Sequence, residues 1–178
     1  MNLKPLKTAG IVSTIMGILF ALTGAVVWGV VTSQLAAERI TVPDDAAFMQ
    51  GATVADPLSA LAQADIINHH AMEGSEGRTY AELGTLTREA RAAGDTELAD
   101  ELTAQRTSVM NASFLRASLF TSVLSYGVCL FAIGVGLTLL VLGWALMSLA
   151  KSLASGATAL TGGTTATRTG DTGGATRA

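Results

Sequence analysis

Two long stretches of the chain carry no charged residue, and they set the predicted architecture. Residues 8–37 are uncharged over 30 positions, and residues 117–150 over 34 positions. A helix needs about 20 apolar residues to cross the hydrocarbon core of a bilayer, so each stretch is long enough to span a membrane. We therefore predict an all-α membrane protein with two transmembrane helices, over residues 9–33 and 117–150.

The first span could also be read as a secretory signal peptide, because Lys4 and Lys7 precede it. The apolar core of a signal peptide usually runs for about 7–15 residues, whereas residues 9–31 form a longer apolar run. We therefore expect this helix to be retained as an anchor. Aromatic residues favour the interface of a membrane, and Trp28, Tyr126 and Trp144 fall near the ends of the two spans.

The basic residues predict which side of the membrane each part occupies. All three lysines, Lys4, Lys7 and Lys151, flank the two spans at the ends that lead to the chain termini. Residues 34–116 have no lysine and carry six arginines against 13 acidic residues, a net charge of −7. Lys and Arg near span ends favour the cytoplasmic side. We expect a hairpin in the plasma membrane, with residues 1–8 and 151–178 cytoplasmic and residues 34–116 extracytoplasmic.

Composition narrows the function classes. Charged residues make up only 14% of the chain, and the mean hydropathy is +0.46. A disordered chain or a nucleic-acid-binding protein needs denser charge. The spans contain no ionisable residue except Cys129, which argues against a proton relay, an ion path or a voltage sensor. With a single cysteine, no intramolecular disulfide is available.

Small residues recur at helical spacing along both spans. The first span has one every four positions from Ser13 to Gly29 and a glycine every seven, and the second has one every seven from Ser122 to Ala150. Helices in lipid associate by close backbone approach, which small residues permit, and a seven-residue period keeps one face toward a partner. These faces could pack the two spans on each other, receive a membrane-protein partner or form a homodimer. The predicted contact residues are Gly10, Gly17, Ala21, Gly24, Cys129, Gly136 and Gly143.

The segment between the spans has clear helix signals. Asp56 followed by Pro57 is a strong helix start, and the helix should run to about Met72. A second, shorter helix is predicted over residues 80–92, with a break at Gly94. From Glu97 onward no proline interrupts the chain, so we expect one helix that continues into the second span.

The regions outside these helices are predicted to be irregular. Proline restricts the residue before it to extended conformations, so residues 41–45 should form a non-helical entry to the outer segment. We expect the second span to end as helix near Ala150. Residues 151–178 are rich in Thr, Gly and Ala. Such a segment buries too little apolar surface to offset its chain entropy, and we predict a disordered tail.

One cluster offers chemistry. Asp65, His69 and Glu73 are four residues apart and so share a helix face, and His70 follows directly. Imidazoles and carboxylates are ligands for divalent metals, and this metal site is the alternative function. A further ligand would have to come from Asp44, Asp45 or Glu82. The same histidines could instead be structural, or could sense pH because imidazole titrates near pH 6.5.

No other motif indicates catalysis or a cofactor. A nucleophile elbow, a phosphate-binding loop, a CxxC pair and a dinucleotide fingerprint are all missing from the sequence. The sequence indicates no small-molecule substrate and no nucleic-acid partner. We predict that the protein is not an enzyme.

Four stretches together carry a family resemblance: residues 40–45 (ITVPDD), 63–70 (QADIINHH), 79–83 (TYAEL) and 110–120 (MNASFLRASLF). The chain resembles a family of small two-span membrane proteins from actinobacteria, whose members are often labelled aromatic-ring-opening dioxygenases. The resemblance implies a bacterial plasma-membrane location and carries over no catalytic residues. Iron dioxygenases of that kind typically use two His and a carboxylate around an open site, whereas here the two His are adjacent.

The sequence therefore predicts a non-enzymatic integral membrane protein. We expect an interaction, accessory or assembly subunit of a membrane or envelope complex. The helix over residues 56–72 is the expected contact element of the outer segment, placed against lipid headgroups or in a groove of a partner.

Overall fold

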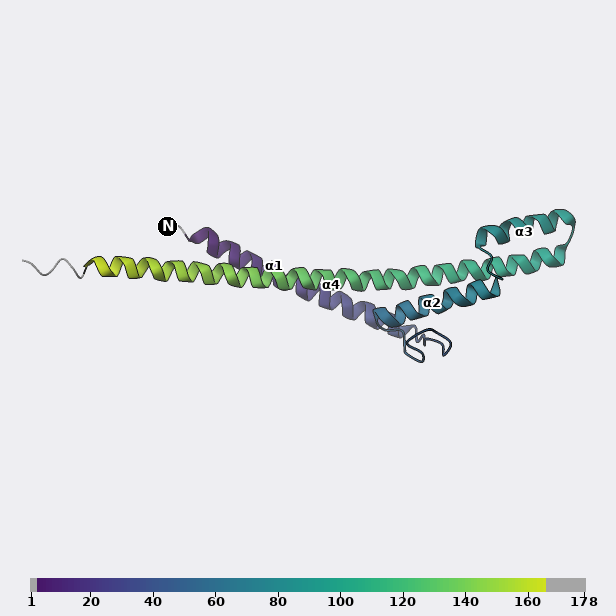
Figure 1. Cartoon of the computed structure of the whole chain (residues 1–178), viewed down its shortest axis with the longest axis horizontal. Coiled ribbons are helices and arrows are strands. Elements are labelled where there is room, and N and C mark those ends of the chain that lie inside the picture. The colour runs from purple at the N-terminus through teal and green to yellow at the C-terminus, as the bar shows by residue number, and fades with distance from the viewer. Residues whose placement is uncertain (1–2, 166–178) are drawn as a thin grey trace, which may run out of the picture. The chain divides into compact units, whose positions relative to one another are not determined.

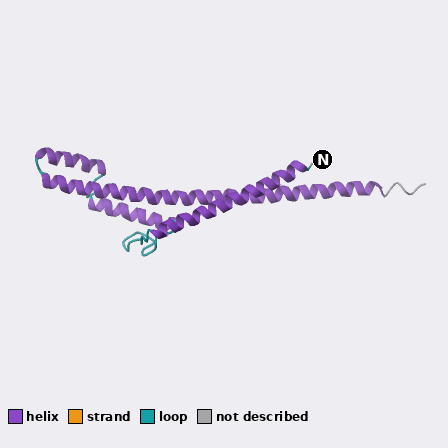
Figure 2. Cartoon of the chain, turned by 180° about the vertical axis from the view of Figure 1, so that it is seen from behind, coloured by secondary structure: helices purple, strands orange, loops and turns teal. Residues whose placement is uncertain are grey.

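The computed structural model describes residues 3–165, and these residues are almost wholly helical. The elements in chain order are α1 (Lys4–Ala37), α2 (Pro57–Gly74), α3 (Tyr80–Ala93) and α4 (Thr96–Thr165) (Figure 1). Among the described residues there is no strand, as Figure 2 shows, and the only β-type pairing there is one isolated bridge. Two of the helices, α1 and α4, are long and apolar enough to cross a membrane. The predicted all-α class with two candidate spans is confirmed.

The chain divides into two compact units, which are described separately. One unit joins the first part of α1, up to Thr23, with the part of α4 that begins at Ala132. The other unit contains residues 24–131. In this second unit α2 lies alongside α4, and α3 folds back beside the first turns of α4 (Figures 1 and 2).

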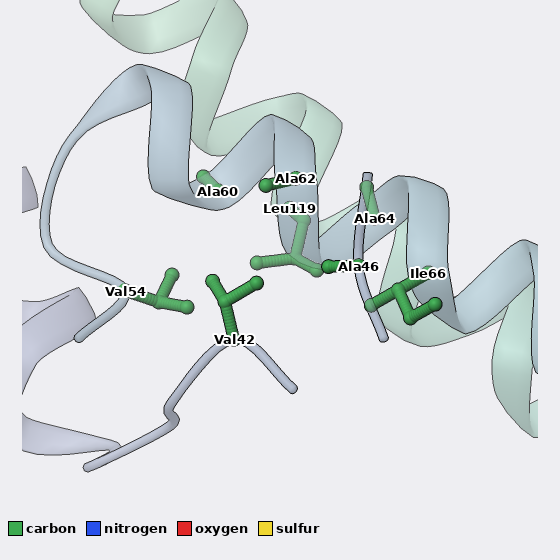
Figure 3. Close-up of a cluster of buried hydrophobic side chains, with 8 residues drawn as sticks. All are labelled: Val42, Ala46, Val54, Ala60, Ala62, Ala64, Ile66 and Leu119. Atoms are coloured by element: carbon green, nitrogen blue, oxygen red, sulfur yellow. The ribbon is translucent and has the colours of Figure 1, made fainter. Parts of the chain in front are cut away.

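The loop between α1 and α2 is non-helical, as predicted, and it is closed by backbone hydrogen bonds. The N–H of Val42 donates to the carbonyl of Ala52 at 2.9 Å, and the N–H of Val54 donates to that of Ile40 at 2.9 Å. The side chains of Val42 and Val54 are buried against α2 and Leu119 of α4, where they form one core cluster of the unit (Figure 3). The loop is therefore anchored to α2 and α4.

The start of α2 is confirmed residue by residue. The Asp56 carboxylate accepts hydrogen bonds from the backbone N–H groups of Leu58 and Ser59, at 2.8 and 3.0 Å. Pro57 occupies the first turn, where its missing N–H costs nothing. Burial raises the pKa of Asp56, but the hydrogen bonds from Ser59 and Leu58 outweigh it and leave the pKa below its ordinary value of 3.8. This end of α2 is thus stabilised by an ionised cap.

The predicted second helix and the long final helix are also confirmed. Thr79 caps α3 in a reciprocal pair with Glu82, and Gly94 ends α3 in the left-handed conformation with φ of 81°. Asp95 then caps α4 by accepting from the N–H of Leu98 at 3.1 Å. A second core cluster joins α3 to α4. Its buried members are Leu83, Ala90, Ala99, Leu102 and Val109.

The end of α4 differs from the prediction. We expected helix to about Ala150 and a disordered tail over residues 151–178, but α4 continues through Thr165. The prediction is therefore wrong for residues 151–165, while residues 166–178 lie outside the described part of the chain. Helix propagation costs little once a long helix exists, and residues 151–160 contain Ala, Leu and Ser with no proline. The low apolar content of residues 151–165 was therefore not sufficient to predict where α4 ends.

Candidate functional site

In the first unit, glycines of α1 and α4 lie close to the backbone of the other helix. A Cβ atom added to Gly17 would lie 2.7 Å from the carbonyl oxygen of Gly136, and one added to Gly136 would lie 2.7 Å from that of Gly17. About two helical turns further along, a Cβ on Gly10 would lie 3.1 Å from the carbonyl oxygen of Gly143. Real Cβ atoms essentially never come closer than 3.0 Å, so this backbone contact depends on glycine.

Polar side chains add to this contact. The hydroxyl of Ser13 on α1 donates to the carbonyl of Leu139 on α4 at 2.8 Å. Ala21 is half-buried, and its backbone nitrogen would lie 2.7 Å from a Cβ on Gly136. Interhelical hydrogen bonds in membrane proteins contribute about 0.6 kcal/mol on average. Close backbone packing is therefore expected to contribute more to this helix contact than the Ser13 hydrogen bond.

The seven-residue spacing describes this face better than the four-residue spacing. In the first unit Gly10, Gly17, Gly136 and Gly143 are buried, and in the second unit Gly24 and Cys129 are also buried. Two members of the four-residue series, Ala25 and Gly29, are exposed instead. A seven-residue repeat is matched to helices that cross at a shallow angle, whereas a straight four-residue series drifts around the helix.

A buried tyrosine organises the second unit, and sequence reasoning placed it only as an interfacial aromatic. The Tyr126 side chain is 1% exposed. Its hydroxyl lies 2.8 Å from that of Thr32 on α1 and donates to the carbonyl of Ala55 at 3.1 Å. Its ring meets Trp28 edge-on, with centroids 4.6 Å apart. One side chain on α4 therefore ties α1 to the end of the loop that precedes α2.

A second set of glycines on α4 has open space around it, as far as residues 3–165 are concerned. Gly127 and Gly134 are exposed, and nothing lies within 4 Å of the position that a Cβ would take on either. They are seven residues apart and so share a helix face. Gly134 and Gly136 are two residues apart, which places them about 200° apart around the helix. The face that carries Gly127 and Gly134 is therefore opposite the glycines that contact α1.

The four residues of the metal hypothesis lie on the surface of α2. Asp65, His69, His70 and Glu73 are all exposed, and the rings of the two histidines are 6.1 Å apart between centroids. His70 Nε2 donates to the carboxylate of Asp45 at 2.7 Å, and this hydrogen bond lowers the pKa of Asp45 below its ordinary value of 3.8. Within residues 3–165 no group of three or more His, Cys, Asp or Glu side chains is placed to hold a metal ion.

Comparison with known proteins adds no relative. No protein-family model, curated protein or solved structure matches this chain. The resemblance to the actinobacterial two-span proteins stays a prediction from the sequence stretches that carry it.

Proposed function

We propose that the protein is a non-enzymatic integral membrane protein whose function is to bind another membrane protein within the bilayer, as an accessory or assembly subunit of a membrane or envelope complex. In this proposal α1 and α4 cross the plasma membrane as a hairpin, with both termini cytoplasmic and α2 and α3 on the extracytoplasmic side. The charge distribution supports this orientation, because the lysines flank the terminal ends of both helices.

The observation that carries the proposal is the open glycine face of α4. Helices in lipid gain little from apolar contact alone, so close backbone approach decides where they associate. Gly136 and Gly143 are already filled by α1, whereas Gly127 and Gly134 are open to the surroundings. Large apolar side chains, among them Leu130 and Phe131, are exposed nearby on the same helix. A partner helix could therefore approach α4 closely at these glycines without displacing α1.

The test fills this face and measures whether companions are lost. Gly127→Leu and Gly134→Leu are introduced together into the tagged full-length protein, which is purified in a mild detergent from its own host. The proposal expects defined companions with the wild-type protein and their loss with the double variant. Ala145→Leu adds the same bulk at another exposed position of α4 and is the matched control. It should retain the companions.

Two results would count against the proposal. Equal recovery of companions with the double variant and with the control would show that the glycine face is not the contact. Migration of the wild-type protein without companions would refute the role as a subunit of a complex. A small homo-oligomer that depends on Gly134 would assign the same face to a second copy of this chain.

A further inference from the structure

A hollow of about 600 Å³ lies between α3 and the first part of α4, in the unit of residues 24–131, and its lining is strongly basic. Three of the six arginines between the two apolar stretches line it: Arg88, Arg91 and Arg106. No Asp or Glu is among the lining residues. The rest of the lining is Tyr80, Ala81, Gly84, Thr85, Thr87 and Thr103. A concentration of positive charge therefore occurs inside a segment whose net charge is −7.

Within the described part of the chain, none of the three arginines has an acidic partner. Arg88 donates to the carbonyl of Gly84 at 3.2 Å and to the Thr85 hydroxyl at 3.1 Å. Arg91 reaches only the Thr103 hydroxyl, at 3.5 Å. Among the described residues, the two ion pairs are His70–Asp45 and Arg78–Glu76, and neither includes a lining residue of the hollow. Each guanidinium has five N–H donors, so most of the donors at this hollow remain available.

The third arginine is held in place by its surroundings. The guanidinium of Arg106 stacks over the ring of Tyr80, 4.0 Å from the ring centroid. A Cβ atom on Gly84 would lie 3.2 Å from Nε of Arg106, so glycine at this position of α3 makes room for the guanidinium. Nε itself is buried and has no hydrogen-bond partner. Arg106 nevertheless lines the hollow, so the other N–H donors of its guanidinium can meet a ligand there.

We propose that this hollow binds the phosphoryl group of a water-soluble ligand. Arginine forks match the oxygens of phosphate and carboxylate groups. A carboxylate has two oxygens and is satisfied by one fork, whereas a phosphoryl group presents at least three oxygens to several donors. Three arginines with threonine hydroxyls beside them therefore favour the phosphoryl group. This inference goes beyond the proposed subunit role, and only the choice of a soluble ligand over a lipid headgroup rests on the proposed orientation.

The position along α4 favours a soluble ligand over a lipid headgroup. Arg106 precedes residue 117, where the predicted second span begins, by 11 residues on one continuous helix. At 1.5 Å per residue, the hollow lies about 17 Å along the helix from the start of the span. The headgroup layer is only about 5–8 Å thick on each side of the hydrocarbon core, so in the proposed orientation a headgroup of the same bilayer would not reach the arginines.

The experiment titrates inorganic phosphate into the full-length protein in a nonionic detergent, by calorimetry at constant ionic strength. Wild type should bind with a saturable isotherm. Arg88→Gln combined with Arg91→Gln should weaken binding by at least about ten-fold, because each variant removes a charge-assisted donor. Arg39→Gln removes the same charge from an exposed position outside the hollow, and is the control that should bind as wild type does.

A second variant changes the site without changing its charge. Gly84→Ala places a methyl group against Arg106 and should weaken phosphate binding. The same substitution raises helix propensity, and unchanged helicity by circular dichroism would separate a loss of binding from an unfolded α3. Binding by Gly84→Ala and by the arginine double variant equal to that of wild type would overturn the proposal, as would an isotherm that does not saturate.

A lipid arm distinguishes the two sources of a phosphoryl group. The titration is repeated with the protein in nanodiscs, with and without phosphatidylglycerol. The soluble assignment expects the same phosphate affinity in both. Competition by the lipid would overturn it and would assign the site to a headgroup.

Discussion

Replacing Tyr126 with phenylalanine tests how the loop before α2 is held. The substitution keeps the buried ring against Trp28 and removes only the hydroxyl. That hydroxyl contacts Thr32 at 2.8 Å and the carbonyl of Ala55 at 3.1 Å. These contacts join residues 94 and 71 positions apart in the sequence. We therefore expect the loop, rather than the long helices, to lose stability.

The magnitude follows from the contacts that disappear. An intramolecular hydrogen bond contributes about 0.5–1.5 kcal/mol net, so the loss of the two bonds to Thr32 and Ala55 should cost about 1–3 kcal/mol. Since about 1.4 kcal/mol corresponds to a ten-fold change in an equilibrium constant, local opening should become about five-fold to about a hundred-fold more frequent. No cavity term applies, because the ring remains in place.

Amide hydrogen exchange measures this opening at the loop itself. The N–H groups of Val42 and Val54 are hydrogen-bonded across the loop and should exchange faster in the variant by that factor. Tyr80→Phe makes the same chemical change at an exposed residue of α3 and is the control. If Tyr126→Phe left the exchange of Val42 and Val54 unchanged, the hydroxyl would not anchor the loop and the reasoning would be wrong.

Three further predictions follow from burial, capping and helix contact. Leu83 has no exposed surface, so Leu83→Ala should destabilise the packing of α3 on α4 by about 2–5 kcal/mol. Amide hydrogen exchange in α3 should then be faster. Leu98→Ala, at an exposed position, should have a much smaller effect. Because the pKa of Asp56 is lowered in the folded chain, its stabilisation of α2 is complete above pH 3.8 and is lost as the pH falls through the lowered pKa. Asp56→Asn keeps a capping oxygen that does not titrate. The variant should therefore lack the acid-dependent loss of helicity that circular dichroism records for the wild type between pH 6 and pH 2. Gly136→Ala would bring a methyl group within 2.7 Å of backbone atoms of α1 and should lower the melting temperature of the protein in detergent. Gly134→Ala, where the space is open, should not lower it. Equal melting temperatures of the two variants would contradict the close helix contact.

Local signals in the sequence predicted most of the helices. The start of α2 at Asp56 and Pro57 and the end of α3 at Gly94 depend on capping and turn preferences, which act over a few residues. The continuity of α4 from Thr96 followed from the lack of any helix breaker. The far end of α4 was missed because a stable helix extends cooperatively into residues that would not form a helix alone.

Features that depend on distant residues could not be predicted in the same way. Tyr126 fits an interfacial aromatic by its position in the sequence, and only the fold brings it to Thr32 and Ala55. The hollow with three arginines is lined by residues of both α3 and α4, which are joined by a turn. No regular spacing in the sequence indicates that Arg88 and Arg106 lie at the same hollow. The histidine spacing was visible, but Asp65, His69 and Glu73 remain on the surface because the small residues of α2 face the core.

The hairpin orientation of the two long helices is the central claim, and one labelling measurement tests it. In a Cys129→Ala background, single cysteines are introduced as Ser108→Cys and Ser152→Cys, both at exposed positions of α4. Intact cells are then treated with a membrane-impermeant maleimide. The account predicts that the cysteine at 108 is labelled in intact cells and that the cysteine at 152 is labelled only after lysis. Labelling of both in intact cells, or of 152 alone, would contradict it.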